Sequence, residues 1–236
     1  MIFTYDHSYE GLLSAIFEIC WRRAEPLAIL PEGEAQHSLF ETPIHVETRQ
    51  DYVERLQNGL HARCGKDGNR LLFRCFSSEK KGVEMLIYYF VKTAMQHPTS
   101  ILKNYRDEKI LELHQIDKQI GREVHRMHAF VRFQETKDGL FAALIQPDFN
   151  VLPLIGQHFE QRYPAFDWLI FDAIRKYGLY WNGEKSSYVT FSGKQHINLG
   201  AALLTSAETD YQQLWQTYFR SVDIPDRRNI KLPLQH

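Results

Sequence analysis

Apolar residues in the first half of the chain recur at three- and four-residue steps, the spacing that gathers them on one face of an α-helix. A short alternating apolar start over residues 2–5 predicts a strand. Asp6 or Ser8 can cap the helix that follows this strand. The spacing predicts helices over 12–19, 51–60, 83–95 and 107–127.

The pattern is broken between the second and third of these helices, where Asn58 and Gly59 are expected to end the second. The run Lys66-Asp67-Gly68-Asn69 predicts a turn, and residues 71–76 suit either a short strand or the start of the next helix. The segment 83–95 is apolar nearly all round, as expected of a helix buried in a core.

After residue 127 the hydrophobic period changes to two, which is typical of strands. Residues 128–134 and 140–145 predict two strands joined at Asp138-Gly139, a pair common in hairpin turns. A helix over 151–163 is expected to cross back over them. Further along we expect strands at 168–172, 176–181 and 188–191, a tight turn at Asn182-Gly183 and a last helix over 205–222.

These elements predict an α+β fold. A helical N-terminal half precedes an antiparallel sheet with a crossing helix, a ββαββ-like arrangement. The length of 236 residues suits a single α+β domain over 1–236. A division near 96–101, into a helical part and a sheet-containing part, is the alternative.

Composition places the chain among globular proteins, with 44% hydrophobic and 24% charged residues. No stretch approaches the roughly 20 consecutive apolar residues of a membrane span. The first 20 residues carry three acidic residues and no Lys or Arg, unlike a secretory signal. We therefore expect a cytoplasmic protein with no membrane association.

Charge is unevenly placed along the chain. Residues 1–60 carry four basic and ten acidic side chains, so a formal net charge of −1 for the whole chain leaves +5 for the remainder. Eight of the eleven histidines also lie after residue 60. This distribution is compatible with a polyanion-binding surface on the later part of the chain, and equally with ordinary variation over a solvated surface.

The three cysteines, Cys20, Cys64 and Cys75, form no C-x-x-C pair, so a zinc ribbon or an iron–sulfur cluster is not expected. His125 and His128, three residues apart, could pinch a metal ion, but the spacing matches no known metal motif. A hydrogen-bonded or phosphate-facing histidine is the simpler interpretation. We predict no metal and no cofactor.

Basic and aromatic residues gather around the junction of the helix and the hairpin. Arg126 and Arg132 lie near His125, and Arg132 is expected to share a strand face with Phe130. An arginine beside an aromatic ring can hold a phosphate and a stacked base. The alternative is an Arg132 paired with a local acid such as Glu135.

Further candidates are spread along the later chain. His158 and Arg162 lie four residues apart and therefore share one helix face. His125 or His158 could act as a general acid or base, with Asp148 activating a water molecule. Residues expected to bind the nucleic-acid backbone or a base are Arg126, Phe130, Arg132, Arg162, Trp181, Arg227, Arg228 and Asn229.

Several strings in this order resemble a bacterial family of proteins assigned to DNA metabolism and repair. They are His125 to Phe133, Gln146-Pro147-Asp148, His158-Phe159 with Arg162, Trp168-Leu169-Ile170, Trp215 to Tyr218, and Ile224-Pro225 with Arg227, Arg228 and Asn229. The start from Tyr5-Asp6 to Phe17-Glu18 is similar as well, so the resemblance covers essentially the whole chain.

The resemblance implies a partner rather than a reaction. Members of that family are associated with a radical-SAM iron–sulfur protein thought to modify or repair DNA, and a similar module is fused in some bacteria to a uracil-DNA-glycosylase-like domain. The iron–sulfur chemistry would then belong to the partner. We expect a DNA-binding accessory protein; the alternatives are a DNA-processing enzyme (a nuclease or base glycosylase) and a structural adaptor for the partner.

Overall fold

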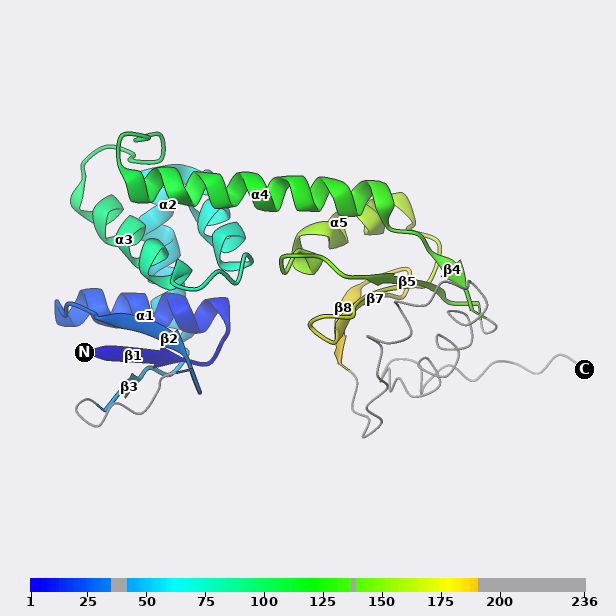
Figure 1. The fold of residues 1–236 in the computed structure, drawn as a ribbon, viewed down its shortest axis with the longest axis horizontal. Coiled ribbons are helices and arrows are strands. Elements are labelled where there is room, and N and C mark those ends of the chain that lie inside the picture. The colour runs from blue at the N-terminus through cyan, green and yellow to red at the C-terminus, as the bar shows by residue number, and fades with distance from the viewer. Residues whose placement is uncertain (35–41, 137–138, 191–236) are drawn as a thin grey trace, which may run out of the picture. The chain divides into compact units, whose positions relative to one another are not determined.

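The structure is a computed structural model that describes residues 1–34, 42–136 and 139–190 (Figure 1). Its contacts divide the chain into two compact units. The N-terminal unit comprises Met1–Val124 with Phe149–Val151, and the C-terminal unit comprises His125–Asp148 and the chain from Leu152 onward. The division falls within a helix, between Val124 and His125.

The N-terminal unit is built on a small parallel sheet. Strand β1 (Ile2–Tyr5) lies between β2 (Ala28–Pro31) and β3 (Ile44–His45) and pairs in parallel with both. Helix α1 (Tyr9–Arg22) connects β1 to β2 and buries Leu12, Leu13 and Ile16 completely. The sequence pattern predicted β1 but missed β2 and β3.

Helix α1 begins where a local signal predicts it. Ser8 is the N-cap, and its hydroxyl accepts a hydrogen bond from the Gly11 N–H at 2.8 Å. Asp6 supports this cap because its Oδ1 accepts bonds from the Ser8 N–H and hydroxyl. Of the two candidate caps in the sequence, Ser8 caps the helix, and Asp6 orients the Ser8 side chain.

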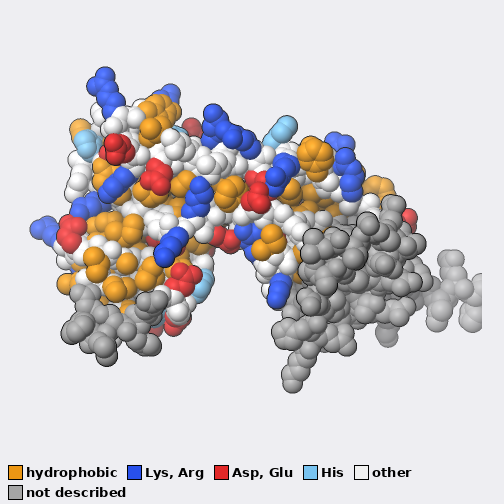
Figure 2. Space-filling view, viewed as in Figure 1, with side chains coloured by type: hydrophobic (Ala, Val, Ile, Leu, Met, Phe, Trp, Pro, Cys, Tyr) orange, Lys and Arg blue, Asp and Glu red, His pale blue; other side chains and the backbone are white. Residues whose placement is uncertain are grey.

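Three further helices belong to the N-terminal unit. They are α2 (Gln50–Phe76), α3 (Val83–Gln96) and most of α4 (Glu108–Phe130). Helix α3 buries Ile87, Phe90 and Val91 almost completely, in agreement with the core helix expected there. Acidic, basic and hydrophobic side chains are interleaved over the face of this unit that Figure 2 shows.

Two predictions for residues 58–69 were wrong, because Asn58 and Gly59 do not end a helix and residues 66–69 do not form a turn. Residues 71–76 are helical, one of the two alternatives expected for them, but they end α2 rather than begin another helix. Gly59 instead allows close packing of α2 on α3, since an added Cβ there would lie 3.1 Å from the Met95 Cε. The one break in α2 is a kink at Gly65, whose φ of 67° favours glycine.

The C-terminal unit contains a five-stranded sheet in the order β4-β5-β6-β7-β8 among its described residues. Its strands are β4 (Gln134–Glu135), β5 (Phe141–Ile145), β6 (Trp168–Asp172), β7 (Tyr177–Trp181) and β8 (Ser186–Thr190). Helix α5 (Leu152–Arg162) connects β5 to β6. Gly156 of α5 lies so close to Leu179 of β7 that a side chain there would clash, with an added Cβ 2.5 Å from the Leu179 Cδ2.

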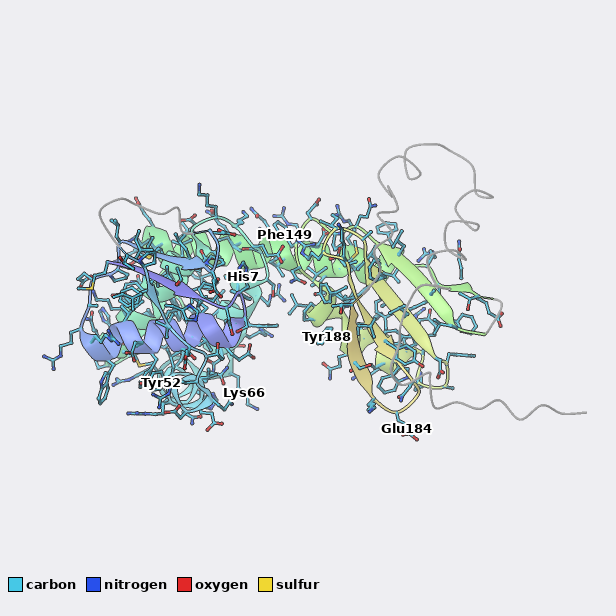
Figure 3. The ribbon with its side chains drawn as sticks, turned by 90° about the horizontal axis from the view of Figure 1, so that it is seen from below. His7, Tyr52, Lys66, Phe149, Glu184 and Tyr188 are labelled. Carbon is cyan, nitrogen blue, oxygen red and sulfur yellow. The ribbon has the colours of Figure 1, made fainter. Side chains whose placement is uncertain are left out.

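The sheet is mixed rather than wholly antiparallel. Strands β5 and β6 pair in parallel, because α5 carries the chain back to the edge from which it left, and the other three described pairings are antiparallel. The predicted turn at Asn182-Gly183 joins β7 to β8: Gly183 has a φ of 86° and the Asn182 side chain accepts the N–H groups of Glu184 and Lys185. Figure 3 shows Glu184 at this turn and Tyr188 on β8.

The strand predicted over 128–134 is wrong in its first part. Helix α4 continues to Phe130, the Val131 N–H still bonds to the Met127 carbonyl at 3.0 Å, and β4 covers only Gln134–Glu135. Phe130 and Arg132 therefore share no strand face. The alternating pattern of His128, Phe130 and Arg132, which favoured a strand, lies at the end of α4.

The α+β class is confirmed, with helices dominating the first half and the larger sheet in the second. The single domain over 1–236 and its alternative boundary near 96–101 stay predictions. The helix predicted over 205–222 and the last residue of the strand predicted over 188–191 lie outside the described residues.

Candidate functional site

A pocket of about 710 Å³ lies in the C-terminal unit, at the end of the sheet where β5 and β6 begin. This volume falls within the range of small-molecule sites, roughly 300–1,000 Å³. Its walls come from the end of α4 and the residues after it, from α5, and from the residues between α5 and β6. Basic lining residues are His128, Arg132, His158 and Arg162, and aromatic ones are Phe133, Phe141, Phe159, Tyr163, Phe166 and Trp168.

Arg132 is held at the pocket by the end of α4. Its Nη1 donates to the carbonyls of Ala129 at 2.8 Å and Val131 at 3.1 Å. These bonds cap the helix and leave the Nε and Nη2 donors of the guanidinium for other partners. Arg132 pairs with backbone carbonyls rather than with Glu135, the acid considered as its partner above.

Arg162 is the last residue of α5 and reaches the same pocket. Its Nε donates to the Tyr163 hydroxyl at 3.2 Å, and its guanidinium lies 5.7 Å from the centre of that ring. Within the described residues, neither Arg132 nor Arg162 forms an ion pair with a carboxylate. The pocket therefore presents two guanidinium groups whose charge no carboxylate of the described residues neutralises.

Two histidines stack in this pocket. The rings of His128 and His158 lie 4.0 Å apart between centroids, with 17° between their planes. Burial lowers the pKa of His128 below its ordinary value of 6.5, and the neighbouring His158 and His125 lower it further. His128 is therefore neutral at pH 7 and can accept a proton there.

Two nitrogen atoms at the pocket lack hydrogen-bond partners within the described chain. They are Nε2 of His128 and Nε1 of Trp168, both buried. Trp168 is 0% exposed and packs against Trp181 on one side and Phe159 on another. A buried polar group without a partner costs about 1–3 kcal/mol, so two such atoms at one pocket point to a ligand or water that satisfies them.

The structure brings together three of the residues predicted to act, namely Arg132, His158 and Arg162. Arg126 and Asp148 instead bond to one another, with 3.1 Å between Nη2 and Oδ2. His125 is exposed on α4 and Phe130 is 69% exposed at its end, and neither lines the pocket. Arg227, Arg228 and Asn229 lie outside the described residues.

Trp181 was predicted to stack on a base, but its surroundings suit another role. Its Nε1 donates to the Pro164 carbonyl at 3.2 Å, and its ring stacks on Trp168 at 6.3 Å. It supports the floor of the pocket from behind and is not among the lining residues. Tyr163 and Phe166 also line the pocket, but the sequence did not mark them as site residues. Both follow the end of α5, outside its periodic pattern, so their aromatic side chains were the only signal that could have found them.

A second hollow, of about 950 Å³, lies in the N-terminal unit at the carboxyl ends of β1 and β2. Here one buried pair and one exposed ring each have a hydrogen-bond partner. The Tyr5 hydroxyl donates to Oε1 of Glu84 at 3.3 Å, and the ring of His7, labelled in Figure 3, donates to the Glu32 carbonyl at 2.6 Å. Burial raises the pKa of both Tyr5 and Glu84.

The described residues include no group of three or more His, Cys, Asp or Glu side chains arranged to hold a metal ion. None of the helices within the described ranges combines the length and apolar character that crossing a membrane requires. The candidate site is thus defined by cations and aromatic rings.

The sequence profile of DUF4130, a domain of unknown function, matches residues 81–236. The chain belongs to the DUF4130 family. The DUF4130 segment begins between α2 and α3 and contains every residue that lines the pocket of the C-terminal unit. A comparison with curated proteins finds no match. DUF4130 carries no assigned function, so the association with DNA repair and with a radical-SAM partner stays a prediction.

Proposed function

We propose that the protein binds nucleic acid and that the pocket of the C-terminal unit receives one nucleotide of a single strand. One observation carries the proposal: Arg132 and Arg162, from different elements, converge on a pocket walled by six aromatic residues without a carboxylate partner among the described residues. Guanidinium groups bind phosphate oxygens, and aromatic rings stack on bases of any sequence.

Phe166 is the best placed ring for stacking. It is 51% exposed, and the Phe141 ring supports it edge to face at 5.2 Å between centroids. The other aromatic residues of the pocket contact one another, as Phe133 does with Phe159 and Tyr163. A base that enters the pocket would therefore find one free face at the mouth and a packed wall behind it.

The direct test is binding of a single-stranded oligonucleotide to the full chain at several salt concentrations. Each phosphate contact contributes a slope of about −0.7 to the plot of log affinity against log salt for single strands, so two arginine contacts predict about −1.4. Arg162→Gln should weaken binding and reduce the slope by about 0.7. Arg122→Gln, exposed on α4 and outside the pocket, is the matched control and should change neither.

Absence of binding at low salt would contradict the proposal. So would binding that Arg162→Gln and Arg122→Gln weaken equally, because the pocket would then have no special part in it. The net charge of −1, with −6 in the first 60 residues, makes long-range attraction weak, so local contacts should dominate the affinity.

An enzyme that removes a base is the second candidate, and the neutral His128 in the pocket favours it. The pKa of His128 is lowered by burial and its ring lines the pocket beside His158, so it could accept a proton from a bound substrate. Asp148, proposed from sequence to activate water, bonds to Arg126 outside the pocket. Incubation with uracil-containing and otherwise damaged oligonucleotides tests this function: product that His158→Ala abolishes would support it, and no product with any substrate would contradict it.

The role beside a radical-SAM partner rests on the sequence resemblance. In this proposal the protein presents DNA to the partner, and its pocket holds the strand. Co-purification with the partner that survives nuclease treatment would support an association. If the association persists while the chain shows no affinity for DNA, the protein is a structural adaptor instead.

A further inference from the structure

We infer that the pocket of the C-terminal unit recognises a phosphate monoester on a nucleotide, as at the phosphorylated end of a strand, and that the His128–His158 pair takes up a proton as the ester binds. This inference rests on the proposed function, because it names the part of the nucleic acid that the same pocket takes. The alternative within that function is an internal nucleotide, whose phosphates are diesters.

The size and floor of the pocket favour a single terminal unit. Its volume of about 710 Å³ is that of a site for one small molecule, whereas strand-binding grooves follow roughly 4–16 nucleotides. Trp168 closes the floor and is 0% exposed, and Trp181 stacks behind it. A nucleic-acid strand that ends in the pocket needs only one opening, but an internal segment of the strand needs a second opening through which the chain leaves.

The charges around the pocket favour a dianion once a proton is added. Arg132 and Arg162 contribute one positive charge each. Helices α4 and α5 both end beside the pocket, and each helix C-terminus acts as about half a negative charge. About one positive charge therefore remains while the histidines are neutral, enough for a diester. A monoester carries between about 1.5 and 2 negative charges at pH 7 and needs a second cation.

The stacked histidines can supply that second charge. Among the described residues, the ionisable or charged groups that face them are His125 on α4, Arg132 after α4, and Arg162 and Tyr163 at the end of α5, and the sheet contributes Phe141 and Trp168. Burial, and then the neighbouring His158 and His125, oppose protonation of His128 in the free protein. A phosphate dianion reverses this balance, and Nε2 of His128, which has no partner in the described chain, becomes a donor once protonated.

The stack is suited to binding rather than to in-line cleavage. An acid and a base that act on opposite sides of a phosphorus atom must flank it, but the two rings lie face to face at 4.0 Å and leave no room between them. Both rings can only approach a phosphate from the same side. The pair is therefore placed to share one added proton.

The experiment compares three forms of one short single-stranded oligonucleotide, labelled on an internal base, with the full chain. One form has hydroxyl groups at both ends, one a 5′-phosphate and one a 3′-phosphate. At least one phosphorylated form should bind about tenfold more tightly than the hydroxyl form. Arg162→Gln should remove this preference, and Arg122→Gln should keep it.

Calorimetry in two buffers of different ionisation enthalpy measures the number of protons that are taken up on binding. Binding of the phosphorylated form at pH 7 should take up a proton, and the hydroxyl form should take up less. His158→Gln should remove the uptake while the arginine contacts remain. The affinity should rise as the pH falls from 8 toward about 6, where the ester itself begins to bind a proton.

The outcomes separate this inference from the proposed function. Equal affinity for all three forms, still sensitive to Arg162→Gln, overturns the inference and leaves nucleic-acid binding standing. A preference without proton uptake overturns the role of the histidine pair. If a free nucleoside monophosphate binds but no oligonucleotide does, the monoester chemistry holds and the strand end is wrong. If neither binds, both proposals fail.

Discussion

The two units each contain a hollow beside a sheet, and the two hollows differ in how the buried polar groups of their lining residues are paired. The N-terminal hollow is the larger, at about 950 Å³ against about 710 Å³. Its buried Tyr5 hydroxyl and Glu84 carboxyl bond to one another. At the C-terminal pocket, by contrast, His128 and Trp168 each present a buried nitrogen without a partner in the described chain.

This difference shows that volume alone does not identify a site. A satisfied buried pair needs nothing further and serves the fold, whereas unsatisfied buried nitrogens beside cations without a carboxylate partner among the described residues need a ligand or ordered water. The N-terminal hollow therefore has a structural role, and the C-terminal pocket is the candidate site. Four predictions test this comparison.

Removing one polar group from each region should have opposite effects on stability. Tyr5→Phe leaves the Glu84 carboxyl, which is only 9% exposed, without its hydroxyl donor and should lower the free energy of unfolding by about 1–3 kcal/mol. His128→Phe removes an unsatisfied nitrogen and should leave the stability unchanged or raise it by up to about 1 kcal/mol. Urea denaturation measures both. Equal destabilisation by the two changes would contradict the comparison.

Removing the exposed ring at the pocket mouth should weaken binding without destabilising the fold. Phe166→Ala should cost about 1–3 kcal/mol of binding to a single-stranded oligonucleotide, the value of one stacked base. Tyr188→Ala removes a comparably exposed ring, 58% against 51%, on β8 and outside the pocket. Anisotropy titration of both variants is the measurement, and the same loss in both would show that the pocket has no special role.

The two regions should respond to pH in opposite directions. The pKa of His128 is lowered in the folded protein, so the unfolded chain binds more protons and stability is lost as the pH falls through 6.5. The pKa of Glu84 is raised, so the folded protein holds its proton longer and stability is lost as the pH rises above 4.5. His128→Gln should flatten the first slope and Glu84→Gln the second in unfolding curves at pH 4.5–7.5. Slopes that each variant leaves unchanged would refute these assignments.

The smallest effect is expected at Arg126, which the sequence pattern had included in the site. Its ion pair with Asp148 is exposed, with 47% and 71% of the two side chains accessible. Such pairs contribute about 0–1 kcal/mol, so Arg126→Gln should change the stability by no more than this. Its affinity for an oligonucleotide should match that of the wild type. A loss as large as that of Arg162→Gln would place the binding surface along α4 instead.

Local signals in the sequence predicted much of the fold. The Ser8 cap of α1 and the Asn182-Gly183 turn depend on neighbouring residues alone, and the structure confirms both. Strands β2 and β3 were missed because they are short and pair in parallel with β1 across long connections, so no local pattern marks them. Gly59 was expected to end a helix, yet it permits close packing on Met95, and the break in α2 comes instead at Gly65.

The candidate site was predictable only in part. The four-residue spacing of His158 and Arg162 placed both on one face of α5, and both reach the pocket. The contact of His158 with His128 joins residues 30 positions apart, and it depends on α4 continuing past Met127. Trp168 lines the pocket because β6 pairs in parallel with β5, which aligns it with Phe141. The spacing of residues along the sequence does not reveal such non-local strand pairing.

The central claim, that nucleic acid occupies the pocket of the C-terminal unit, is tested most directly by the indole N–H of Trp168. This proton belongs to a residue that lines the pocket and has no partner in the described chain, whereas the indole N–H of Trp181 already donates to Pro164. With a single-stranded oligonucleotide, the assigned Trp168 indole resonance should shift in NMR spectra, and that of the exposed Trp21 in the N-terminal unit should not. Binding that leaves the Trp168 resonance in place would contradict the account.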